Sequence, residues 1–318
     1  MTCRIYIENP PPFKRARRGD GHGLVDVAIE EGIETARYYL DSGLRVVNFH
    51  HSDLDPYEAK QRAGRTLPYR YDSFAYVERL KNMLGGFGGL LVPHRVVVYQ
   101  TLEQQENAFR LLAKAGVSNV VLVGKPYATP PERTMYRCTV EDMLAHLRNR
   151  MLGFHLGVIG IHSRRQEPER IARKFESAGR RLRVMGQFLD EVKPMTAFLD
   201  DLARAFETRK LGFDGLEWNV GLAILALKDR TFYAKLLRKD ALACEDRFSG
   251  LRSVEERIDE SVRMNLEFAA RVREKGQEIG LDIGFSIQPL IERSPDGAVH
   301  PGVYGALELA KELDRLWP

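Results

Sequence analysis

Residues 120–124 read VVLVG and residues 157–161 read GVIGI, two nearly continuous apolar runs. Uninterrupted apolar runs are typical of parallel strands that are buried on both faces of a sheet. Residues 139–151 lie between the two runs and have the pattern of an amphipathic helix. This strand–helix–strand unit predicts a parallel sheet covered by helices, because parallel strands need a long crossover connection.

The same alternation of strands and helices extends outward in both directions. Strands are predicted at 3–8, 45–51, 95–101, 119–125, 155–163, 182–189, 215–227 and 282–289. Helices are predicted at 24–42, 71–84, 102–115, 139–151, 167–178, 193–209, 229–243 with 253–279, and 302–316. Eight strand–helix pairs without an evident internal boundary predict an α/β protein with one (β/α)8 TIM barrel domain over residues 1–318. A doubly wound open sheet is the main alternative, but no GxGxxG loop follows any predicted strand.

Local signals at the helix ends agree with these boundaries. Thr139 with Asp142, and Ser253 with Glu256, have the spacing of side chains that cap a helix amino terminus. Glycines follow four predicted helices, where a left-handed residue commonly ends the helix. They are Gly43, Gly116, Gly179 and Gly280.

Composition excludes several classes of protein. The 318 residues are 44% hydrophobic and 29% charged, as expected of a globular protein with a large core. The formal charge of +4 is too small an excess for a nucleic-acid-binding protein, so we expect no nucleic acid partner. No apolar run is long enough to span a bilayer and no leader pattern is evident. Three scattered cysteines indicate reduced thiols, and together these features predict a cytoplasmic protein.

The polar residues at the strand ends are the candidate site, because barrels of this class carry their active sites at the carboxyl ends of the strands. The candidates are Glu8, His50, Gln100, Lys125, His162, Arg164 and Gln187. Histidines and a carboxylate also suit a divalent metal, but no compact ligand spacing appears and cations stand among them. We therefore expect no metal.

Three of these residues have alternative interpretations. Glu8 precedes the prolines at 10–12 and is either a general acid at the barrel mouth or one partner of an ion pair. Gln187 offers a donor and an acceptor in one plane, which suits a heterocycle edge, or it satisfies loop backbone. Lys125, like Lys228, is either a Schiff-base lysine, a surface lysine or a lysine that binds an anionic ligand group.

Two segments together resemble the methylenetetrahydrofolate reductase family. Residues 6–11, YIENPP, are similar to the family's F-E-x-x-P-P start, and residues 184–190, VMGQFLD, are similar to its I-T-Q-x-x-F-D strand. Residues 119–124, 156–160 and 197–200 match further family segments in order and spacing, so the resemblance covers most of the chain.

The resemblance implies an eight-stranded barrel that reduces 5,10-methylenetetrahydrofolate to 5-methyltetrahydrofolate with NAD(P)H, directly or through FAD. Glu8 matches the family's general acid, and Gln187 matches the glutamine that hydrogen-bonds the pterin. We also assign Lys125 and Gln100 to substrate binding, with Lys125 facing a folate glutamate tail or a cofactor phosphate. His162, Arg164 and His50 are the candidates for cofactor binding.

The departures from the family concern FAD. Lys125 replaces the family's aspartate, and residues 161–165, IHSRR, replace the Y-P-E-x-H element that helps to seat the flavin. Residues 220–226, VGLAILA, replace the family's P-G-I-x-P strand. A flavin-independent member is therefore one interpretation. A folate-dependent methyltransferase or demethylase component and a non-catalytic folate-binding barrel are the alternatives, and the sequence leaves the oligomeric state open.

Overall fold

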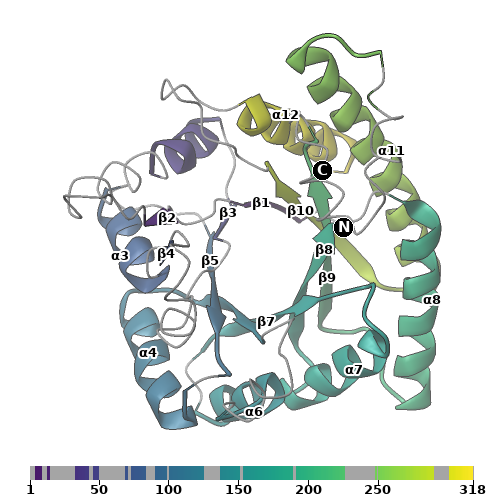
Figure 1. Ribbon diagram of the computed structural model, residues 1–318. Coiled ribbons are helices and arrows are strands. Elements are labelled where there is room, and N and C mark those ends of the chain that lie inside the picture. The colour runs from purple at the N-terminus through teal and green to yellow at the C-terminus, as the bar shows by residue number, and fades with distance from the viewer. Residues whose placement is uncertain are drawn as a thin grey trace, which may run out of the picture.

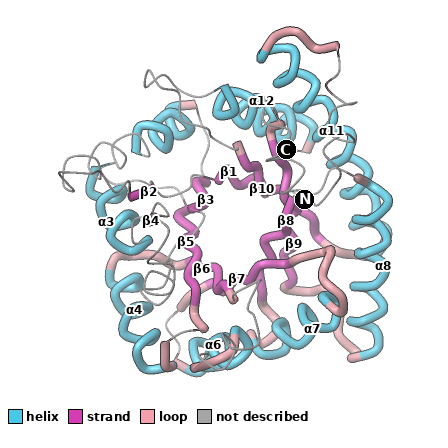
Figure 2. The backbone as a smooth tube through the Cα atoms, in the orientation of Figure 1, coloured by secondary structure: helices cyan, strands magenta, loops and turns pink. Residues whose placement is uncertain are grey.

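Eight parallel strands close into a barrel (Figure 1 and Figure 2). The computed structural model describes residues 4–8, 13–14, 33–42, 46–49, 69–70, 73–83, 90–98, 100–124, 137–150, 153–188, 191–225, 248, 250–289 and 301–317. The barrel strands are β1 (Ile5–Glu8), β3 (Val46–Phe49), β5 (Leu90–Val96), β6 (Asn119–Val123), β7 (His155–Gly160), β8 (Leu182–Phe188), β9 (Leu216–Ala223) and β10 (Asp282–Gln288). The predicted (β/α)8 barrel is confirmed, and the open sheet is excluded because β1 pairs with both β3 and β10.

Helices surround the barrel and cover the outer face of its sheet (Figure 1). Residues 33–41 are helical. The other helices are α3 (Ser73–Met83), α4 (Leu102–Lys114), α6 (Val140–Asn149), α7 (Glu167–Ser177), α8 (Val192–Thr208), α11 (Val254–Ile279) and α12 (Pro301–Leu316). A small antiparallel pair, β2 (Phe13–Lys14) with β4 (Tyr69–Arg70), lies outside the barrel sheet. None of the helices in the described ranges combines the length and the apolar character needed to cross a membrane.

The predicted helix caps are present. The Thr139 hydroxyl accepts from the Asp142 N–H, and the Asp142 carboxylate accepts from the Thr139 N–H. Ser253 and Glu256 make the same reciprocal pair at the start of α11. Gly280 ends that helix with a φ of 73°, a left-handed conformation that glycine adopts without steric cost. Gly43 lies outside the described residues.

The third strand of the barrel corrects a sequence prediction. It spans Leu90–Val96, whereas the sequence predicted residues 95–101. Pro93 stands inside the strand and pairs in register with Phe49 of β3, although proline is rare in central strands because it lacks an N–H. The correction moves His94 from a loop to the strand interior. Strands β7 and β9 also end earlier than predicted, at Gly160 and Ala223.

Apolar side chains fill two separate spaces. The larger core lies between the strands and the helices, and its largest fully buried side chains include Trp218, Phe109 and Phe175. A smaller cluster fills the barrel interior and consists of Tyr6, Val92, Val121, Val123 and Met185. The interior is therefore a packed core and not a channel, as in other barrels of this class.

Charged side chains close the amino-terminal end of the interior. We call Arg4, His155, Arg183, Glu217 and Asp282 the basal network. Arg183 Nε donates to Glu217 Oε2 at 2.9 Å, and Arg183 Nη2 donates to His155 Nδ1 at 3.0 Å. Arg4 pairs with Asp282 and lies 3.8 Å from the Glu217 carboxylate. The two arginines, the neutral His155 ring and both carboxylates therefore each have at least one partner within this network.

Candidate functional site

A β-bulge positions Gln187 at the carboxyl end of the barrel. Met185 pairs with Asn219, and Phe188 pairs with Gly221. Between these two pairs β8 has one residue more than β9, which is a β-bulge. A Cβ atom at residue 221 would lie 2.5 Å from the Phe188 nitrogen, so only glycine allows the bulge to approach. Gln187 is half-buried, and no described residue forms a hydrogen bond with its side chain. Its amide keeps both a donor and an acceptor for a ligand.

The strand register relates Gln187 to Glu8. Barrels of this class are staggered by about eight residues over eight strands, so one level recurs about one residue further along each successive strand. Glu8, the last residue of β1, pairs with Asn48, and Asn48 pairs with Val92 on β5. Two strands further on, the level of Glu8 is therefore reached two residues beyond Val92, at His94.

The same register places Gln187 about one residue above that level, through the pairings that join β5 to β8. The two residues that carry the family resemblance thus occupy neighbouring levels of one barrel end. His94 is only 2% exposed and lies on the same face of β5 as Val92, a member of the interior cluster, and Val96, which packs against that cluster. The side chain of Glu8 is outside the described part, and its backbone pairing with Asn48 alone gives its level.

Gln100 lies in the connection between β5 and α4. Its side-chain oxygen accepts from Arg95 Nη2 at 3.0 Å, and Arg95 Nε donates to Gln105 Oε1 of α4 at 2.6 Å. Arg95 alternates with His94 along β5 and therefore faces the helices. The structure thus links Gln100 to the helix layer through Arg95, and its assignment to substrate binding stays a prediction.

His162 and Arg164 follow β7. His162 is half-buried in the turn. Arg164 Nη1 lies 3.5 Å from Glu167 Oε2, and the fully buried Glu167 carboxylate also accepts from the Ile161 N–H at 3.2 Å. Burial lowers the pKa of Lys174, whose Nζ lies 3.9 Å from the same carboxylate. The loop whose His162 and Arg164 are predicted to bind a cofactor is therefore partly held by the buried carboxylate of Glu167 at the start of α7.

Three predicted residues lie outside the described part of the chain. They are His50, Lys125 and Lys228. Among the residues that are described, no group of three or more His, Cys, Asp or Glu side chains has an arrangement that could hold a metal ion.

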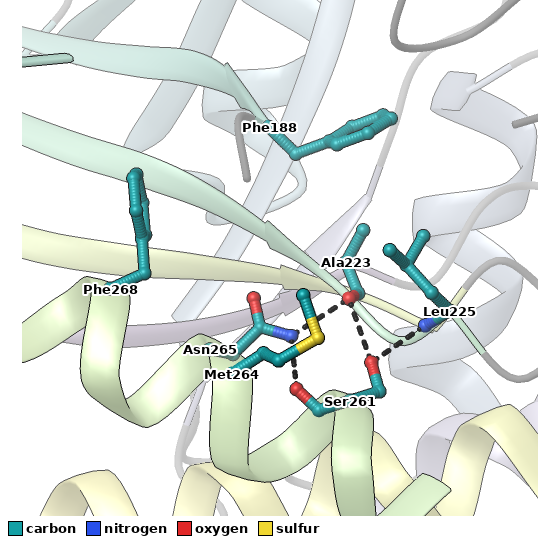
Figure 3. Close-up of a pocket in the computed structure, with 7 residues that line it drawn as sticks. All are labelled: Phe188, Ala223, Leu225, Ser261, Met264, Asn265 and Phe268. Atoms are coloured by element: carbon teal, nitrogen blue, oxygen red, sulfur yellow. Dashed lines mark hydrogen bonds between the residues drawn. The ribbon is translucent and has the colours of Figure 1, made fainter. Parts of the chain in front are cut away.

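A small cavity of about 20 Å³ lies at the carboxyl ends of β8 and β9 and against α11 (Figure 3). Its lining residues are Phe188, Ala223, Leu225, Ser261, Met264, Asn265 and Phe268. The two phenyl rings stand at either side of the amide of Asn265 in this view. The cavity combines apolar walls with a few polar groups, as ligand sites commonly do.

Sequence reasoning missed two residues of this barrel end. His94 was missed because the strand was placed after it, although the apolar residues at 90–92 already signalled an earlier start. Asn265 was not considered because it lies on a helix. A polar residue on the stripe formed by Ile258, Val262, Phe268 and Ala269 is the signal that could have found it.

No protein-family model matches the sequence, and no curated protein is significantly similar to it. Solved structures do share its fold. One is an uncharacterized protein from Clostridium thermocellum that binds two copies of 5-methyl-5,6,7,8-tetrahydrofolic acid. It has a TM-score of 0.65 and 16% identity, and the match covers 99% of this chain and 96% of that chain.

A monooxygenase and a riboflavin lyase are also similar in fold. EDTA monooxygenase (EmoA) from Chelativorans sp. BNC1 has a TM-score of 0.54 and 9% identity over 100% of this chain and 95% of its own. Riboflavin lyase (RcaE), with modified FMN and substrate riboflavin, has a TM-score of 0.54 and 11% identity over 98% and 92%. At these identities the similarity shows the barrel fold.

Proposed function

We propose that the chain binds a reduced folate at the carboxyl end of its barrel and reduces 5,10-methylenetetrahydrofolate to 5-methyltetrahydrofolate with NAD(P)H. The observation that carries the proposal is the position of Gln187. The bulge holds its amide at the barrel mouth without a hydrogen-bond partner among the described residues, about one level above Glu8. The barrel from Clostridium thermocellum that binds 5-methyltetrahydrofolate supports a folate ligand for this fold.

Gln187 would hold the pterin. An amide presents one acceptor and two donors in a plane, which matches the alternating donors and acceptors on the edge of a pterin ring. Such paired hydrogen bonds fix the orientation of the ring as well as its position. The ring is thereby aligned for transfer at its one-carbon bridge, since catalysis depends on holding the reacting atoms in line.

Glu8 would act as the general acid. Its carboxyl proton moves to N10 of the folate as the bond between N10 and the methylene carbon breaks, which leaves the carbon double-bonded to N5. A hydride from C4 of the nicotinamide then adds to that carbon and gives the methyl group. NAD(P)+ and 5-methyltetrahydrofolate are the products, and the Glu8 carboxylate regains a proton from solvent.

The described residues do not fit a flavin site of the family type. The loop after β7 lacks the family's tyrosine and glutamate, and Arg164 within it is paired with Glu167. We therefore propose direct hydride transfer from NAD(P)H, with no step through FAD. The absorption spectrum of the purified protein tests this point, because bound flavin absorbs near ~450 nm as a property of the cofactor.

Two measurements test the function. Calorimetric titration with 5-methyltetrahydrofolate should show saturable binding, and anaerobic oxidation of NADH or NADPH should require 5,10-methylenetetrahydrofolate. Glu8→Gln should abolish turnover and retain folate binding, because the amide cannot donate the catalytic proton.

The outcomes separate the alternatives. Folate binding without NAD(P)H oxidation, with and without added FAD, would contradict the reductase and favour a methyl-transfer component or a non-catalytic folate-binding barrel. Absence of folate binding would contradict all three.

A further inference from the structure

The cavity between Phe188 and Phe268 contains one polar group whose orientation is fixed by its neighbours. The Asn265 side-chain nitrogen donates to the backbone oxygen of Ala223 at 2.9 Å and to that of Ser261 at 2.7 Å. Both partners are carbonyls, which only accept hydrogen bonds. A flipped amide would place its oxygen against two oxygens, so the nitrogen of Asn265 faces the two carbonyls and its oxygen faces away from them.

The other face of this amide is uncommitted. Both N–H groups of Asn265 are used, and no described residue donates to its Oδ1. The residue is only 9% exposed. Figure 3 shows the oxygen pointing away from Ala223, toward the space between the two phenyl rings. An acceptor that keeps its hydrogen-bond capacity in a largely apolar wall is available to a donor group of a ligand.

The remaining polar group of the wall is already satisfied. Ser261 Oγ accepts from the Leu225 N–H at 2.8 Å and donates to the Ala223 oxygen at 3.3 Å. Asn265 and Ser261 therefore share one carbonyl partner, but the Ser261 hydroxyl already donates and accepts, whereas no donor among the described residues reaches Asn265 Oδ1. Ser261 is a matched control for the structural part of this arrangement.

We propose that the cavity is a subsite for one N–H-donating substituent of a flat heteroaromatic ligand, which donates to Asn265 Oδ1 between Phe188 and Phe268. The volume of about 20 Å³ has room for one group the size of a water molecule or an amino group, and not for a ring. Phe188, which lines the cavity, belongs to the same bulge as Gln187, so the cavity and that amide lie at the same end of the barrel. The inference rests on the proposed folate ligand, whose pterin carries an exocyclic amino group at C2.

The test compares two ligands on three proteins. Wild type, Asn265→Leu and Ser261→Ala are titrated with 5-methyltetrahydrofolate and with its analogue that carries a methyl group in place of the 2-amino group. Wild type should bind the amino ligand about ten-fold more tightly than the methyl analogue, as expected for the loss of one hydrogen bond. Asn265→Leu should reduce this ratio to nearly one, and Ser261→Ala should keep it.

The ligand comparison on wild type keeps the test decisive if Asn265→Leu does not fold. An additional ligand with a 2-dimethylamino group should bind wild type worst of all, because it has no N–H and exceeds the cavity. Equal binding of all three ligands to wild type would overturn the amine subsite and leave folate binding intact, as would an unchanged ratio in folded Asn265→Leu. If none of the ligands bound, the proposed function itself would fail, and the subsite with it.

Discussion

The two ends of the barrel interior use polar side chains in opposite ways. At the amino-terminal end, the basal network pairs each charged group with another, as Arg183 does with Glu217. At the carboxyl-terminal end, Gln187 has no hydrogen bond from a described residue, and Asn265 keeps its oxygen uncommitted. Polar groups with satisfied partners hold a fold together, whereas groups with remaining capacity are available to a ligand.

This difference predicts where substitutions act. Changes in the basal network should alter stability and leave ligand binding per folded molecule unchanged. Changes at the carboxyl end should do the reverse. A change in the β8 bulge, which holds Gln187, should affect both stability and ligand binding.

The largest effect on stability is expected from Arg183→Met. Arg183 is 4% exposed and donates to Glu217, to His155 and to Asn119 Oδ1 at 2.9 Å. Its removal leaves a partly buried carboxylate with weaker compensation, so we expect a loss of about 3–5 kcal/mol in the free energy of unfolding. Urea denaturation measures it.

Arg204→Met is the control, because Arg204 pairs with Asp201 on the exposed face of α8 and such pairs contribute little. Equal losses in the two variants would contradict the structural role of the basal network. Folate affinity of the folded fraction should be the same in both.

Gly221→Ala should damage both properties. The added Cβ would lie 2.5 Å from the Phe188 nitrogen and 2.7 Å from the Gln187 carbonyl carbon, and both are backbone atoms that move only with the strand. We expect a loss of about 2 kcal/mol from overpacking, together with weaker folate binding because Gln187 is displaced.

Gly212→Ala is the matched control for that variant, since a Cβ at residue 212 has no neighbour within 4 Å. Calorimetry and urea denaturation of both variants provide the comparison. Unchanged folate affinity in Gly221→Ala would show that the bulge does not position the ligand.

Acidification should weaken the basal network through His155. Burial, and next the nearby Arg183, lower the pKa of His155 from 6.5 to about 4. Because Arg183 can only donate, the neutral ring must accept at Nδ1 and carry its proton on Nε2, which lies 3.5 Å from Glu217 Oε1. Protonation at Nδ1 would break the contact with Arg183 and set two cations side by side.

The lowered pKa of His155 determines whether stability rises or falls with pH. Between the folded pKa of about 4 and the unfolded value of 6.5, the unfolded chain binds more protons, so stability falls as the pH falls. Wild type should lose about 1 kcal/mol between about pH 7 and pH 5.5, beyond any loss seen in His155→Gln. The glutamine keeps an acceptor for Arg183 and does not titrate. Urea denaturation at each pH measures the free energy of unfolding of both proteins. The same pH dependence in wild type and in His155→Gln would show that His155 is not the cause.

The sequence predicted the fold well because apolar runs such as 120–124 and 157–161 reflect burial on both faces of a strand. It also predicted the caps at Thr139 and Ser253, where the interacting residues are neighbours in sequence. The predicted bounds of β5 were wrong, because Pro93 is unusual inside a central strand, and His94 was therefore placed in a loop. For Asn265 the only local signal is a polar residue on the apolar stripe of its helix, because its partner Ala223 lies 42 positions away and no local pattern encodes that contact.

The smallest effect on stability, and the most informative about function, is expected from Gln187→Leu. The half-buried Gln187 side chain has no hydrogen bond from a described residue, so its loss should leave the free energy of unfolding unchanged. Folate affinity should fall about ten-fold, since a ligand would lose at least one hydrogen bond.

Gln105→Leu is the same chemical change at a residue that is 1% exposed, accepts from Arg95 at 2.6 Å and donates to the Val97 oxygen at 3.2 Å. That variant should lose stability and keep folate affinity. If both glutamine variants behaved alike in the two measurements, hydrogen-bond capacity at the barrel mouth would not distinguish a binding residue from a structural one, and the case for Gln187 as the pterin ligand would fail.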